Sequence, residues 1–113
     1  MPLLKSGISK LTDFTKKGYK NMKLNFKDLV FESDEMTRIK RAKIVIGAYD
    51  LSIIQELNNP RYEIAIFDSS ERWARIPGIN ENSDVVPNLT KEDVEGIMNN
   101  LYTFVRNMPY NLL

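Results

Sequence analysis

The chain of 113 residues contains no cysteine and no histidine. It can therefore form no disulfide, no thiolate metal site and no thiol nucleophile, and it lacks the commonest general base. Glycine is also scarce, and Gly47 and Gly78 stand alone, so no glycine-rich phosphate loop is present. These absences favour a protein that is not an enzyme and that needs no metal or cofactor.

Carboxylates are the acid-base groups that remain. They gather at residues 32–35, 68–71, 81–84 and 92–95, and none of these groups has the spacing of a calcium-binding loop. The last group falls at the predicted start of a helix, where acidic side chains suit the helix dipole. We therefore expect these residues to be solvated or to cap a helix rather than to hold a metal.

Long apolar runs are missing as well. No stretch approaches the roughly 20 apolar residues of a membrane span, and lysines interrupt residues 1–23 throughout, unlike a secretory signal. We therefore expect a cytoplasmic protein, or a virion protein if the source is viral. Asparagine and isoleucine, with eleven copies each, and lysine, with ten, have AT-rich codons, which is typical of many phage genomes.

Charge divides the chain into a basic arm and an acidic body. Residues 1–31 carry seven Lys against two Asp, whereas residues 32–113 carry nine Lys and Arg against thirteen Asp and Glu. At about 100° per residue, residues 3–23 place apolar and lysine side chains on opposite sides of one amphipathic helix. We therefore predict a basic helical arm over residues 1–23 and a single domain over residues 24–113.

The arm is the first candidate interaction site. Its candidate contact residues are Leu4, Lys5, Ile8, Lys10, Leu11, Phe14, Lys16, Lys17, Lys20 and Lys23. Such a segment can lie on its own domain, on a neighbouring subunit or on an anionic surface. Protein is the expected partner; nucleic acid remains an alternative, and a membrane is not favoured.

The strongest β signal covers residues 38–57, which we interpret as one long strand with a bulge or bend at Gly47. Residues 62–67 alternate as a second strand, and the turn at residues 58–60 makes the two an antiparallel hairpin. The first strand is apolar on both faces, so its sheet should need two covers. One would be the C-terminal helix, and the other the arm or another subunit.

The remaining segments complete an α+β prediction. Short strands are expected at residues 24–31 and 72–76, and a loop at residues 77–89. Thr90 and Asp93 form a capping box that begins a C-terminal helix. Apolar residues then recur at helical spacing until Pro109 ends the helix. The predicted fold is a small, mainly antiparallel sheet of roughly three to five strands packed by amphipathic helices at both ends of the chain.

The second candidate interaction site is the motif Arg72-Trp73-Ala74-Arg75. On a strand, Trp73 and Arg75 share a face, and an aromatic ring beside a guanidinium can anchor an interface or stack on a base. The alternative is a tryptophan that closes the end of the core, with arginine at its rim.

Two stretches carry a resemblance. Pro60-Arg61-Tyr62-Glu63-Ile64 leading to Trp73, followed by Val86-Pro87-Asn88-Leu89-Thr90-Lys91-Glu92-Asp93-Val94, resembles the hairpin-then-helix order of single-stranded-DNA-binding proteins with the PC4-like fold. The resemblance implies a curved sheet that binds single strands. The strand at residues 62–67 departs from that pattern, because it carries Glu63 and no lysine.

Together these features favour a non-catalytic structural or adaptor subunit of an oligomeric assembly, such as a phage or virion component. The alternative is a small single-stranded nucleic-acid-binding protein that uses Arg72, Trp73, Arg75 and the arm lysines.

Overall fold

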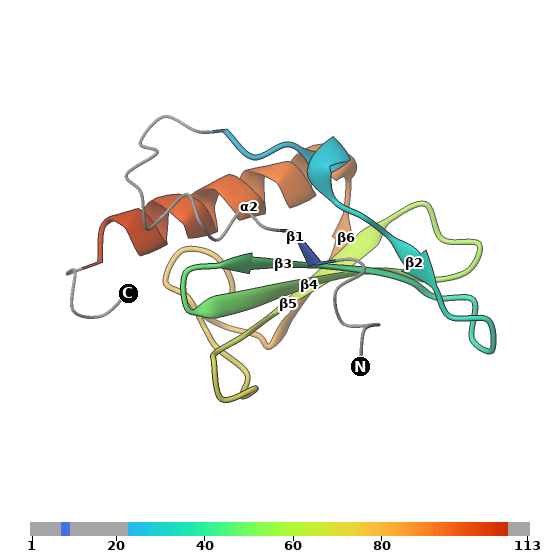
Figure 1. The fold of residues 1–113 in the computed structure, drawn as a ribbon, viewed down its shortest axis with the longest axis horizontal. Coiled ribbons are helices and arrows are strands. Elements are labelled where there is room, and N and C mark those ends of the chain that lie inside the picture. The colour runs from blue at the N-terminus through green and yellow to red at the C-terminus, as the bar shows by residue number, and fades with distance from the viewer. Residues whose placement is uncertain (1–7, 10–22, 109–113) are drawn as a thin grey trace.

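The computed structural model describes Ile8–Ser9 and residues 23–108, which form one sheet and the helix that covers it (Figure 1). The sheet contains β1 (Ile8–Ser9), β2 (Glu32–Ser33), β3 (Lys40–Ile46), β4 (Tyr49–Gln55), β5 (Tyr62–Phe67) and β6 (Val85–Leu89). The helix is α2 (Lys91–Arg106), and a short 3-10 helix, η2 (Phe26–Asp28), lies near its N-terminal end. The predicted α+β class, with a mainly antiparallel sheet and a C-terminal helix, is confirmed.

The strands lie in the order β1-β3-β4-β5-β6, and β2 also pairs with β3. Neighbours from β3 to β6 are antiparallel, and the short β1 runs parallel to β3. The predicted hairpin that pairs residues 62–67 with the strand before them is confirmed as β4–β5.

The long strand predicted over residues 38–57 is wrong, because it is two strands. Ile46 pairs with Tyr49, which leaves Gly47 and Ala48 as a two-residue hairpin loop. Gly47 has φ +63°, a conformation that glycine adopts without steric cost and that is typical of such tight loops. Since the chain reverses at Gly47, the apolar residues on both sides of it turn to the same face.

That face forms the hydrophobic core. Side chains of β3 and β5 alternate between buried and half-buried along most of their length, as expected when one face is covered. On β4 the three central residues, Leu51, Ser52 and Ile53, are all buried. The sheet residues at the centre of the core are Ala42, Ile44, Ile46, Leu51, Ile53, Tyr62, Ile64 and Ile66. The expectation that this sheet needs two apolar covers is therefore not supported.

Helix α2 covers the core face, as Figure 1 shows. Its buried residues are Val94, Met98, Leu101, Tyr102 and Val105, which recur at helical spacing. Thr90 Oγ1 accepts a hydrogen bond from Asp93 N, and Asp93 Oδ2 accepts one from Thr90 N, each at 3.0 Å. The predicted capping box is confirmed; Pro109, the predicted stop, lies outside the described residues.

Three further predictions are corrected. Residues 24–31 form no strand, because η2 lies there and the short β2 follows at the expected acidic turn. Of residues 72–76, only Trp73 makes a β-bridge. The predicted loop over residues 77–89 ends early, since Val85–Leu89 is β6, whose irregular pairing and exposed Pro87 hide its strand signal.

The predicted arm helix lies outside the described residues except at two positions. Ile8 and Ser9 are not helical there; they pair with Lys43 and Ile44 on β3. An exposed strand edge offers unpaired backbone groups, which explains why an extended segment is favoured at that point.

Candidate interaction surface

The face of the sheet opposite α2 is the candidate site, and we refer to it as the open face. No element among Ile8–Ser9 and residues 23–108 lies across it (Figure 1). Strand alternation and register arrange its side chains in three rows. The rows are Val45, Asp50, Phe67 and Trp73; Lys43, Ser52, Ala65 and Val85; and Arg41, Ile54 and Glu63.

An aromatic pair stands at one corner of the open face. The ring centroids of Phe67 and Trp73 lie 4.8 Å apart, with the rings tilted by 40°. Trp73 is 53% exposed, so the interpretation of a tryptophan that closes the core is wrong. An aromatic pair with a half-exposed indole is the composition expected at the centre of a protein interface.

The turn after β5 holds Trp73 in place. Asp68 N donates a hydrogen bond to Arg72 O at 2.8 Å, and Asp68 Oδ1 accepts hydrogen bonds from Ser70 N and Arg72 N. These backbone donors, with Arg72 N the most important, lower the pKa of Asp68, and the Arg72 guanidinium acts in the same direction. Ala74 N then donates to Ile66 O at 2.8 Å, which keeps Trp73 beside Phe67.

The loop after Trp73 is held by a buried asparagine. Asn80 is 4% exposed; its Oδ1 accepts a hydrogen bond from Ile76 N at 2.7 Å, and its Nδ2 donates to Ala74 O at 2.9 Å. Because the segment is fixed on both sides, the indole needs little further ordering to bind a partner.

The two arginines of the motif are engaged with acids of their own chain. Arg75 Nε lies 3.1 Å from Asp84 Oδ1, and Arg72 Nε lies 3.9 Å from Asp68 Oδ2. Both pairs are largely exposed, so they hold the arginines weakly. Even so, neither arginine adds an uncompensated positive charge beside Trp73.

Four other charges on the open face have no such partner. Within residues 23–108, Arg41, Lys43, Asp50 and Glu63 take part in no ion pair. The two bases lie on β3, at one side of the open face, whereas the two acids lie on β4 and β5. The open face therefore carries equal numbers of separated positive and negative charges.

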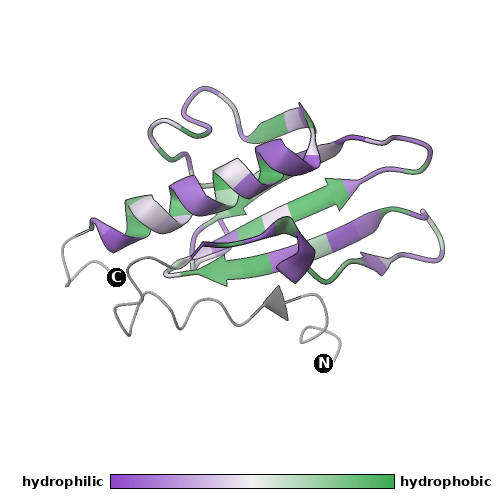
Figure 2. Ribbon diagram, turned by 90° about the horizontal axis from the view of Figure 1, so that it is seen from above, coloured by the Kyte–Doolittle hydropathy of each residue, from purple (hydrophilic) through white to green (hydrophobic). Residues whose placement is uncertain are grey.

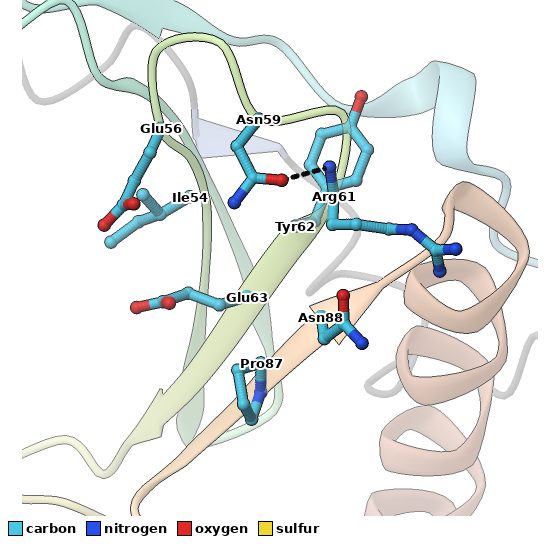
Figure 3. Close-up of a pocket in the computed structure, with 8 residues that line it drawn as sticks. All are labelled: Ile54, Glu56, Asn59, Arg61, Tyr62, Glu63, Pro87 and Asn88. Carbon is cyan, nitrogen blue, oxygen red and sulfur yellow. Dashed lines mark hydrogen bonds between the residues drawn. The ribbon is translucent and has the colours of Figure 1, made fainter.

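Beyond Glu63 the open face ends in a small hollow of about 180 Å³ (Figure 3). Ile54, Glu56 and Glu63 point to one side of the sheet there, while Arg61 points toward α2. Hydrogen bonds from the backbone and side chain of Thr90 lower the pKa of Asp93, and the Arg61 charge adds a smaller effect in the same direction. Among the described residues, no group of three or more acidic side chains is placed to hold a metal ion.

The arm residues are mostly not located. Leu4, Lys5, Lys10, Leu11, Phe14, Lys16, Lys17 and Lys20 lie outside the described residues, and Ile8 is placed only as part of β1. Lys23 is exposed beside Glu92 and Glu95 of α2. No described helix is both long and apolar enough to cross a membrane.

Sequence reasoning missed most of the open face. Phe67, Val45 and the four unpaired charges were not recognised as one surface, because the pairing of β3 with β4 across Gly47 and of β4 with β5 brings them together. The isolated glycine between two β-branched runs was the available signal. Comparison of the chain with protein-family models, curated proteins and solved structures finds no match.

Proposed function

We propose that this protein is a non-catalytic structural or adaptor subunit that joins an oligomeric assembly through its open face. A phage or viral particle is the kind of assembly that the composition favours. The supporting observation is the half-exposed Trp73, which is packed on Phe67 and held by Asp68 and Asn80. A rigid aromatic anchor of this kind contributes strongly to protein interfaces.

Photo-crosslinking in the cells that encode the protein tests this proposal. We expect Trp73→p-benzoylphenylalanine to crosslink to protein on irradiation, with the products identified by mass spectrometry. The matched control is the same substitution at Met36, which is 92% exposed but lies in the β2–β3 turn, away from the open face. Equal crosslinking at both positions, or none to protein at position 73, would contradict the proposal.

The alternative is a single-stranded nucleic-acid-binding protein, which the exposed aromatic pair also favours, because bases stack on such rings. Asp50 and Glu63 on the same face, and the engagement of both motif arginines, favour it less. It predicts quenching of Trp73 fluorescence by an oligonucleotide, with steep weakening as salt increases. If fluorescence does not change at low salt, the alternative is rejected.

A further inference from the structure

We infer that the partner of the open face is a second copy of this chain, bound face to face about a two-fold axis. This inference rests on the proposed function and names the occupant of the same surface. The four unpaired charges carry it. A symmetric dimer brings one patch against itself, so a surface that carries separated charges of both signs can complement its own copy.

The register of the sheet indicates where the axis lies. If the axis runs along β4, then β3 of each copy lies over β5 of the other. Within a row, Arg41 then faces the other copy's Glu63, and this contact occurs twice. The same rotation places Val45 of each copy opposite Phe67 of the other, so this apolar contact also occurs twice.

The other unpaired charges are compatible with this arrangement. Asp50 lies on β4 and therefore on the axis, where it faces the other copy's Asp50; Lys43 is its diagonal neighbour on β3. Diagonal neighbours on a sheet are about 7–8 Å apart, which a lysine side chain can span. Each Asp50 can therefore be reached by a Lys43 of either copy, which offsets the proximity of the two carboxylates.

The size of the face indicates a weak dimer. Around an axis on β4, the strands β3, β4 and β5 of the two copies overlap; three strand positions about 4.8 Å apart, with three outward residues on each at about 6.8 Å spacing, cover roughly 14 by 20 Å. Counted over both copies, this is about 600 Å² before the relief of the side chains, which is below the lower limit of about 1,000 Å² for specific interfaces and in the range of transient contacts. We therefore expect a transient dimer with a dissociation constant weaker than the micromolar range.

Analytical ultracentrifugation of the full chain from about 1 µM to 1 mM tests for the dimer, with Trp73 fluorescence as a second readout. Arg41→Glu and Glu63→Arg each place two like-charge contacts in the homodimer. Each substitution should weaken dimerisation at least about tenfold. The matched control, Arg38→Glu, changes an exposed residue in the β2–β3 turn and should leave dimerisation unchanged.

Mixing the two variants identifies the geometry. The R41E variant has Glu at positions 41 and 63, and the E63R variant has Arg at both. Each contact between position 41 of one copy and position 63 of the other is therefore attractive in the heterodimer. We expect the mixture to form heterodimers with an affinity close to that of the parent chain, and the double variant R41E/E63R to recover homodimers. Circular dichroism should show that every variant is folded.

The outcomes separate this inference from the proposed function. A chain that stays monomeric to 1 mM, or a mixture that fails to recover, overturns the face-to-face dimer. In that case a crosslink from position 73 to a different protein would still support the adaptor function. A crosslink from position 73 to another copy, together with recovery in the mixture, supports both.

Discussion

Gly47 decides which side chains of β4 lie on the covered face of the sheet, because the chain reverses at this residue. Its φ is +63°, and a Cβ built at this position would lie 2.6 Å from Cγ1 of Val105 on α2. The glycine is therefore required twice: for the left-handed turn between β3 and β4, and for the close approach of the helix. A single residue thus controls both the hairpin and its packing.

Gly47→Ala should lower the free energy of unfolding by about 3 kcal/mol, from the strain of a positive φ and from overpacking against Val105. Urea denaturation measures the change. Gly78→Ala is the control, since Gly78 has φ +80° but a Cβ added there would meet no atom within 4 Å. The control should lose about 1 kcal/mol, from backbone strain alone. Equal losses at both sites would show that Val105 makes no steric contribution.

Among the elements, α2 has two roles. It covers the core, and its side chains bind the backbone of the segment that leads into η2. Asn99 Oδ1 accepts a hydrogen bond from Leu24 N, and Asn99 Nδ2 donates one to Leu24 O, both at 2.8 Å. Glu95 Oε2 accepts a hydrogen bond from Phe26 N at 2.7 Å. Since Leu24 is 1% exposed, its backbone groups depend on these partners.

Asn99→Ala should lower the free energy of unfolding by about 2 kcal/mol, because it leaves the backbone groups of Leu24 buried without partners. Hydrogen exchange should show faster exchange at the amide of Leu24, whereas the amides at the centre of β4 should change only with global stability. The neighbouring Asn100→Ala is the control, because Asn100 is exposed, and it should stay within about 0.5 kcal/mol of the parent chain. An unchanged exchange rate at Leu24 would mean that Asn99 does not hold this segment.

At the scale of the whole molecule, α2 covers one face of the sheet, and no other element of residues 23–108 lies across the opposite face. Figure 2 shows the apolar stretches of the strands gathered beside α2, with hydrophilic residues at the start of β3. Of the four large hydrophobic residues that are exposed among the described ones, Trp73 lies on the open face, whereas Val30 precedes β2 and Met36 and Leu57 lie in the turns after β2 and β4. The open face is therefore the side of the described sheet that the proposed assembly would use.

Acid should destabilise the whole domain through two carboxylates. The pKa values of Asp68 and Asp93 are lowered in the folded chain, chiefly by backbone hydrogen bonds from Arg72 and Thr90 respectively. A carboxyl with a lowered folded pKa stabilises the fold above its unfolded value of about 3.9. That contribution is lost as the pH falls through the folded pKa.

Urea midpoints measured from pH 7 to pH 2 should therefore fall below about pH 4. Asp93→Asn should be less stable than the parent at pH 7 and should lose less on acidification, because asparagine cannot take up the proton. If the acid loss is the same with and without the Asp93 carboxyl, the capping box does not contribute to the pH dependence.

The elements that sequence reasoning predicted correctly depend on local rules. The capping box at Thr90 and the spacing of Val94, Met98 and Leu101 are enough to predict α2. The alternation from Tyr62 to Phe67 is enough to predict β5. In both cases the signal lies within a few residues of the structure that it predicts.

The open face could not be predicted in this way. A strand has a side-chain period of two, so treating the hairpin at Gly47 as continuous moves every later side chain of the strand to the wrong face. The Trp73 motif was recognised, but its contact with Phe67 and its exposure depend on the turn at Asp68.

The sequence by itself determined the fold class, the C-terminal helix and the lack of cysteine and histidine chemistry, because composition, capping and periodicity are local properties. Only the tertiary structure decided which face of the sheet is covered, and that Arg41, Lys43, Asp50 and Glu63 share the open one. These residues are distant in the chain, and only strand register brings them together.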